Sequence, residues 1–195
     1  RRLTAFLLLL VLAYALYRFA LFAWQIAAFP YPVDYGEGPL LIQVGRLAGG
    51  ENIYTADLSH APYTITNYPP LYMLLQVPFY WLFGPAFWYG RLLSLLGMSA
   101  AALFLGLIVH QLTQDRLAGL AAGLLLFSLP YVRAWAPLCR VDPLALGLSW
   151  GGLYLLARLG RPIQRGQWQP MLTGAALLLT AAIYTRQSYG LAAPL

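Results

Sequence analysis

The chain of 195 residues contains no lysine, and charged residues make up only 9% of it. Hydrophobic residues account for 61%, and the mean hydropathy is +0.65. Soluble domains contain about 25% charged residues on average, so this composition excludes an ordinary water-exposed surface. Long apolar runs are typical of membrane-spanning helices, whereas membrane barrels show short alternating segments. We therefore predict an integral membrane protein built from helices.

Signatures of metal and nucleophile chemistry are also missing. Cys139 is the only cysteine, which excludes an intramolecular disulfide and a site built from several thiolates. His60 and His110 are far apart in the sequence and belong to no cluster with metal-ligand spacing. The chain has neither a phosphate-binding glycine-rich loop nor a nucleophile elbow. No metal or cofactor is predicted from these patterns.

The net charge of +6 comes entirely from 12 arginines against six acidic residues. These arginines occur mostly singly near the ends of apolar runs, whereas a nucleic-acid-binding domain concentrates its basic residues in one patch. The pattern favours lipid headgroups, phosphates and membrane topology as the reason for the arginines. Membrane lipids, and no nucleic acid, are the predicted partners.

Five apolar segments are predicted to span the membrane. They cover Leu3–Ala28, Gly90–Leu112, Leu117–Ala136, Pro143–Arg158 and Met171–Tyr184. The segment Leu71–Phe83 is too short, because roughly 20 apolar residues are needed to cross upright. Gly119-x-x-x-Gly123 and Gly147-x-x-x-Gly151 offer small faces for close helix packing. The predicted fold class is an all-α integral membrane protein, a polytopic helix bundle.

The positions of the arginines orient these spans. The connection 158–165 is the most basic one, and two arginines precede the first span. Placing both on the cytoplasmic side, as the positive-inside rule prefers, puts residues 29–68 outside. Leu71–Phe83 must then begin and end on the outside, as a re-entrant or interfacial segment. The prediction is a long external first loop that carries juxtamembrane helices.

Two carboxylates three residues apart follow the first span. Asp34 and Glu37 belong to the group of four acidic residues that ends at Asp57. A carboxylate above a membrane cavity can act as a general base and take a proton from an acceptor hydroxyl or amine. Alternatively, Asp34 caps a helix that begins near Pro39. A divalent cation would need more ligands than these two carboxylates supply, so we do not predict one.

The segment Asn67-Tyr68-Pro69-Pro70-Leu71-Tyr72 joins the acidic loop to the short apolar segment. Its prolines pre-set φ at a helix start. The two tyrosines, Tyr68 and Tyr72, belong either to an aromatic belt at the membrane interface or to a polar substrate pocket that includes Asn67.

Three arginines on the same predicted face are candidates for binding a donor phosphate. Arg133 and Arg140 precede the fourth span, and Arg186 follows the fifth. The planar fork of arginine suits bidentate contact with phosphate oxygens. The alternatives are a structural pair between Arg140 and Asp142, with Asp142 as a helix N-cap, and simple snorkelling of Arg186 to the interface.

The ordered set of segments resembles the N-terminal part of the membrane glycosyltransferases of the GT-C fold. The chain looks most similar to bacterial relatives of protein O-mannosyltransferases and aminoarabinose transferases. The resemblance covers nearly all of residues 1–195, and we interpret the chain as part of a longer protein. It rests on the acidic first loop, Tyr68-Pro-Pro-Leu-Tyr, Gly90-Arg91-Leu-Leu-Ser, Arg140-Val-Asp142 and Thr185-Arg186-Gln187.

The resemblance implies transfer of a sugar from a polyprenyl-phosphate donor to a lipid, glycan or protein acceptor. The active site would lie on the external face of a bacterial inner membrane. Asp34 would be the general base of an inverting reaction, and Arg140 and Arg186 would hold the donor phosphate. Close relatives often have adjacent acids in this loop, whereas two residues separate them here. Asp34 and Glu37 therefore both remain candidates for the base.

Two other functional classes are consistent with the sequence. One is a non-catalytic transmembrane subunit of a larger complex, and the other is a transporter or polymerase of lipid-linked sugars. A transporter needs polar residues through the whole membrane thickness, whereas the polar residues here gather on one predicted side.

Overall fold

The computed structural model describes residues 2–55, 57, 59, 61, 63, 65–160 and 168–192, and the regular structure in these ranges is entirely helical. The elements are α1 (Arg2–Ala28), α2 (Glu37–Ala48), α3 (Leu71–Leu74), α4 (Val77–Phe83), α5 (Trp88–Thr113), α6 (Arg116–Leu125), η1 (Leu126–Ser128), α7 (Pro130–Trp135), α8 (Val141–Leu159), α9 (Trp168–Thr185) and η3 (Gln187–Ala192).

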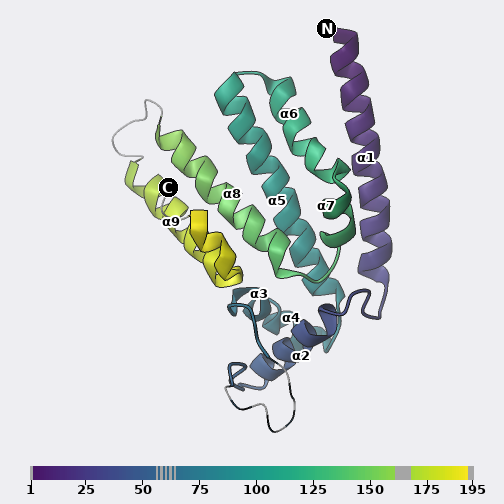
Figure 1. The fold of residues 1–195 in the computed structure, drawn as a ribbon, viewed down its shortest axis with the longest axis vertical. Coiled ribbons are helices and arrows are strands. Elements are labelled where there is room, and N and C mark those ends of the chain that lie inside the picture. Colours follow the sequence, from purple (N-terminus) through teal and green to yellow (C-terminus); the bar gives the residue numbers. More distant parts are fainter. Residues whose placement is uncertain are drawn as a thin grey trace.

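The long helices lie side by side, and the short helices α2, α3 and α4 gather at one end of them (Figure 1). In the bundle, α5 packs against both α6 and α8, and α8 also packs against α9. The first helix, α1, lies along α6 and contacts η1 and α5. Because α2, α3 and α4 contact one another, they form a small cap on the bundle. The predicted placement of Leu71–Phe83 at one end, rather than across the bundle, agrees with the positions of α3 and α4.

Glycines allow the closest helix contacts. A Cβ atom on Gly97 of α5 would lie 2.4 Å from Leu144 Cα of α8, and one on Gly147 would lie 2.3 Å from the Gly97 carbonyl oxygen. Gly119 makes a similar approach to α5, since its Cβ would lie 2.6 Å from the Gly106 oxygen. The packing role predicted for the Gly119 and Gly147 motifs is therefore confirmed.

Two of the described helices are long and apolar enough to cross a membrane, namely Leu3–Ala28 and Trp88–Thr113. The first of them leaves most of its apolar side chains exposed, including Leu7 and Val11. Length and composition of this kind indicate membrane association. The remaining predicted spans stay predictions.

The prediction of one continuous helix over Leu117–Ala136 is wrong. The helix α6 ends at Leu125, η1 follows, and α7 begins at Pro130. Leu129 adopts an extended conformation because the ring of Pro130 disfavours helical geometry in the preceding residue. Proline also supplies no N–H to continue the helical ladder.

The contact at Gly97 generates a prediction about stability. Gly97→Ala forces a methyl group against the backbone of Leu144, which no side-chain rotation can relieve. We expect a loss of about 1–3 kcal/mol, measured as a lower midpoint of thermal unfolding in detergent. Gly38→Ala is the matched control, because nothing lies within 4 Å of its Cβ position. Equal midpoints for the two variants would contradict the packing argument.

Candidate functional site

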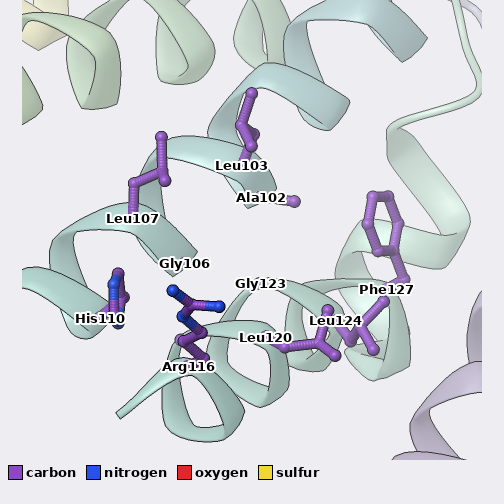
Figure 2. Close-up of a pocket in the computed structure, with 11 residues that line it drawn as sticks. Ala102, Leu103, Gly106, Leu107, His110, Arg116, Leu120, Gly123, Leu124 and Phe127 are labelled. Atoms are coloured by element: carbon purple, nitrogen blue, oxygen red, sulfur yellow. The ribbon is translucent and has the colours of Figure 1, made fainter. Parts of the chain in front are cut away.

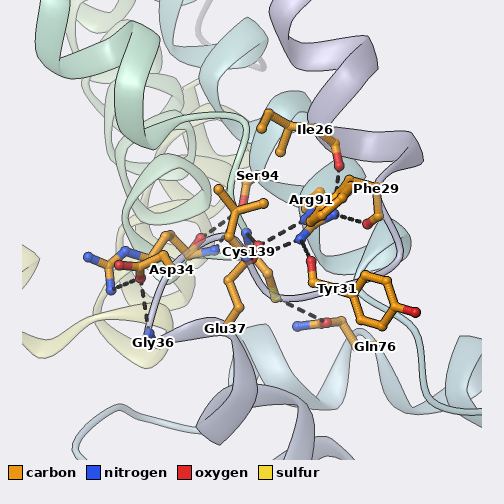
Figure 3. A network of polar contacts seen from close by, with 12 residues as sticks. Ile26, Phe29, Tyr31, Asp34, Gly36, Glu37, Gln76, Arg91, Ser94 and Cys139 are labelled. Carbon is orange, nitrogen blue, oxygen red and sulfur yellow. Dashed lines mark hydrogen bonds and ion pairs between the residues drawn. The ribbon is translucent and has the colours of Figure 1, made fainter.

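A fully buried ion pair joins the side chains of Glu37 and Arg91 (Figure 3). Glu37 is the first residue of α2, and Arg91 lies in the first turn of α5. The contact is bidentate: Arg91 Nε donates to Glu37 Oε1 at 2.9 Å, and Nη2 donates to Oε2 at 2.8 Å. This fork geometry is the strong form of an arginine–carboxylate contact.

The remaining donors of Arg91 bind the chain that leaves α1. Its Nη1 donates to the carbonyl oxygens of Ile26 and Phe29, and Nη2 donates to that of Tyr31. All five N–H groups of the guanidinium are thereby used. Arg91 consequently fixes the path of the first loop where it departs from the long helix.

Glu37 also accepts two backbone hydrogen bonds, from Val33 N–H at 2.8 Å and from Cys139 N–H at 2.7 Å. Burial raises the pKa of this carboxyl, but Arg91 and the two N–H donors outweigh burial and hold the pKa below its ordinary value. A carboxylate enclosed by four donors has no free face for a substrate proton. This geometry gives Glu37 a structural role and does not support it as the base.

Asp34 has a different environment three residues earlier. Its Oδ2 accepts the Gly36 N–H at 3.0 Å and lies 3.2 Å from Arg140 Nη1. Its side chain is 11% exposed, whereas that of Glu37 is fully buried. The capping interpretation is wrong, because α2 begins at Glu37 with Gly36 as N-cap and no side-chain cap. Asp34 is thus the more accessible of the two carboxylates.

Arg140 is held on several sides. Its guanidinium lies over the ring of Trp135 at 4.5 Å and near that of Tyr35 at 5.7 Å. Its backbone N–H donates to Ser94 Oγ, and the Ser94 hydroxyl approaches the Arg140 carbonyl oxygen at 2.9 Å. The Ser94 contacts hold the Arg140 backbone against α5, whereas the Trp135 ring of α7 and the Asp34 carboxylate orient the guanidinium. Such positioning suits recognition of an anion.

A third ion pair of the site joins Arg186 to Asp142, and the Arg186 guanidinium lies 6.0 Å from the centre of the Tyr68 ring. Asp142 lies in the first turn of α8, whose N-cap is Arg140 without a side-chain cap. The predicted N-cap role of Asp142 is therefore wrong. The predicted pair of Asp142 with Arg140 is also wrong, because Asp142 pairs with Arg186. Both members of the pair are about one-third exposed, so they remain accessible to water.

A cavity of about 370 Å³ opens beside these ion pairs. Among the predicted site residues, Arg140, Asp142, Asn67 and Tyr68 line it. A smaller, mainly apolar cavity of about 180 Å³ shares Arg140 and Asp142 with the first. The two cavities therefore meet at Arg140 and Asp142, and the smaller one is the more apolar.

Five predicted residues do not line either cavity, namely Asp34, Glu37, Tyr72, Arg133 and Arg186. Asp34 and Arg186 still contact the cavity-lining residues Arg140 and Asp142. Tyr72 is fully buried, and its hydroxyl donates to the Gly90 carbonyl oxygen at 2.8 Å while contacting Ser94 Oγ at 2.8 Å. Through this contact Tyr72 helps to position the Ser94 hydroxyl that binds the Arg140 backbone, and it lies in the core rather than at a cavity. Arg133 is exposed and has no ion-pair partner among the described residues.

The sequence patterns did not indicate the role of Arg91 or of several cavity-lining residues. Burying an unpaired arginine in an apolar segment costs free energy, so the presence of Arg91 in such a segment could have indicated a buried acidic partner. The cavity walls contributed by Tyr35, Gln43 and Trp135 carried no comparable signal. In the ranges that the structure describes, no group of three His, Cys, Asp or Glu side chains is placed to hold a metal ion.

Comparison with known proteins gave no match to a protein-family model, to a curated protein or to a solved structure.

The buried ion pair yields a test of the structural role of Glu37. Glu37→Gln keeps the shape of the side chain but leaves Arg91 as an unpaired buried charge, so we expect a loss of about 3–5 kcal/mol in unfolding free energy. The surface pair of Glu51 with Arg46 provides the control, since the Glu51 side chain is 60% exposed. Glu51→Gln should cost less than about 1 kcal/mol. Similar thermal midpoints for both variants in detergent would refute the structural role.

Proposed function

We propose that this chain is the N-terminal part of a multi-pass membrane glycosyltransferase that uses a polyprenyl-phosphate sugar donor. The observation that carries the proposal is the contact of Asp34 with Arg140 beside a cavity at one end of the helix bundle. A partly exposed carboxylate next to a positioned arginine supplies a base and an anion-binding group at adjacent points. Both are required for transfer from a phosphate-linked donor.

In the proposed reaction an acceptor hydroxyl oxygen attacks the anomeric carbon of the donor sugar. The bond from that carbon to the phosphate oxygen breaks, and the hydroxyl proton passes to the Asp34 carboxylate. The polyprenyl phosphate leaves with the bonding electron pair, and Arg140 stabilises its developing charge. Because there is one displacement, the anomeric configuration is inverted.

Arg186 is proposed as a second, more exposed contact for the donor phosphate. Its ion pair with Asp142 lies next to Tyr68, which lines the same cavity as Arg140. The apolar cavity that shares Arg140 suits the first part of a prenyl chain, because it is lined by Leu146 and Met98. Arg133 has no place in this arrangement.

The proposed location is a bacterial plasma membrane with the cavity on the external face. Two helices of membrane-spanning length support membrane insertion, and the basic connection 158–165 favours the opposite face as cytoplasmic. The proposed acceptor is a lipid, glycan or protein that reaches the cavity from outside.

The base assignment is tested with the full-length protein in membranes and a radiolabelled polyprenyl-phosphate sugar. Asp34→Asn should lower the transfer rate by at least about 10²-fold, the usual contribution of a positioned base, while donor binding persists. Glu51→Gln changes another carboxylate of the same loop and should leave the rate unchanged. Transfer at the normal rate by Asp34→Asn would overturn this assignment, and absence of any donor binding by the unaltered protein would favour a non-catalytic subunit.

The phosphate assignment is tested by comparing two neighbouring arginines. Arg140→Gln removes a positioned charge from the cavity wall and should weaken donor binding about tenfold or more, as expected for one charge-assisted hydrogen bond. Arg133→Gln makes the same charge change at an exposed position outside both cavities and should alter the dissociation constant less than about twofold. Equal losses for the two variants in a donor-binding titration would contradict a specific role for Arg140.

A further inference from the structure

A separate cavity lies away from the proposed active site, in a groove of about 380 Å³ between α5 and α6 (Figure 2). Its walls are leucines, among them Leu103 and Leu120, which are 59% and 52% exposed. Its floor is nearly bare backbone, because Gly106, Gly119 and Gly123 face it. An open channel with apolar walls and a smooth floor suits a hydrocarbon chain.

The glycines also allow a close approach of the α5 and α6 backbones along this floor. A Cβ atom on Gly119 would lie 2.6 Å from the Gly106 oxygen, and one on Gly123 would lie 2.6 Å from the Ala102 oxygen. The helices therefore touch through backbone atoms along the groove. The groove is a direct consequence of this small-residue packing.

One end of the groove is polar and cationic. Arg116, the first residue of α6, and His110, in the last turn of α5, lie together there, while Leu124 and Phe127 lie at the other end (Figure 2). His110 Nδ1 is shielded from solvent and has no hydrogen-bond partner among the described residues. Arg116 likewise has no ion-pair partner in the part of the chain that the structure describes.

Asp115, the carboxylate next to Arg116 in the sequence, forms hydrogen bonds with the backbone of α6. Asp115 Oδ1 accepts the N–H groups of Leu117 and Ala118 and so caps α6. Arg158, in the last turn of α8, lies at the same end of the bundle, where Gln111 of α5 donates to the Ala157 carbonyl oxygen. The polar end of the groove therefore complements an anion.

This end also lies at the correct depth for a membrane surface. His110 follows Arg91 by 19 positions on the continuous helix α5, which corresponds to about 28 Å along the axis. The hydrocarbon core of a bilayer is about 30 Å thick. With Arg91 at one interface, the pair of Arg116 and His110 reaches the opposite interface, and the apolar groove extends from there into the hydrocarbon region.

We propose that this groove binds one acidic phospholipid, with its phosphate between Arg116 and His110 and one acyl chain along the glycine floor. The site lies in the leaflet opposite the cavity lined by Arg140 and Tyr68, and it is separate from any donor site there. The inference does not depend on sugar transfer, since it uses only the span of α5 and the chemistry of the groove. A lipid bound here would fasten α6 to α5, whose contact otherwise depends on glycine backbone.

The test is a lipid titration of the delipidated protein in detergent by native mass spectrometry. Dioleoylphosphatidylglycerol is the acidic probe and dioleoylphosphatidylcholine is the neutral one. The unaltered protein should bind the acidic lipid at least about fivefold more tightly, the effect of one arginine beside an anionic lipid surface. Arg116→Gln should abolish that preference, and Arg116→Lys should retain part of it. Equal binding of the two lipids by the unaltered protein would overturn the proposal.

Two further variants separate this site from general surface charge. Arg158→Gln makes the same charge change at the same end of the bundle. Because Arg158 does not line the groove, this variant should keep the lipid preference. Leu120→Trp fills the groove from an exposed position and should weaken binding of the acidic lipid. Loss of preference in Arg158→Gln equal to that in Arg116→Gln, or unchanged binding by a folded Leu120→Trp protein, would each refute the site.

Discussion

The buried ion pair of Glu37 with Arg91 is the interaction on which the arrangement of this end of the molecule depends. It joins four separate parts of the chain: the exit from α1, the start of α2, the first turn of α5 and the loop before α8, through Cys139 N–H. Two charges in a dry interior are tolerated only when their hydrogen bonds are complete. Here they are complete, because the loop between α1 and α2 follows a path that places its carbonyl oxygens against the Arg91 guanidinium.

The second consequence is a graded series of ion pairs with different accessibility. The Glu37 pair is fully buried, the pair of Asp34 with Arg140 is slightly open, and the pair of Arg186 with Asp142 is about one-third exposed. The innermost pair fixes the backbone, and the outer two lie next to the cavities. The same kinds of side chain therefore serve structure or chemistry according to how many donors and acceptors the fold leaves free.

The two ends of the bundle are built on different principles. At the end capped by α2, α3 and α4, polar side chains complete one another's hydrogen bonds around a cavity. At the other end, glycine packing between α5 and α6 leaves an apolar groove that ends at Arg116 and His110. The continuous helix α5 takes part in both, with Arg91 near one end and His110 near the other, so it sets their separation at about the thickness of a bilayer core.

Sequence alone determined the helical class, the two long apolar helices, the small-residue packing faces and the end of the molecule where Asp34, Arg140, Tyr68 and Asp142 lie. These depend on local composition, periodicity and the direction in which successive helices run. Only the tertiary structure decided which carboxylate is enclosed, which arginine pairs with which acid, and that Tyr72 points into the core. Those outcomes depend on partners far along the chain, such as Glu37 and Arg91, 54 residues apart. Burial and hydrogen-bond partners arise only when the helices pack, and no local pattern contains them.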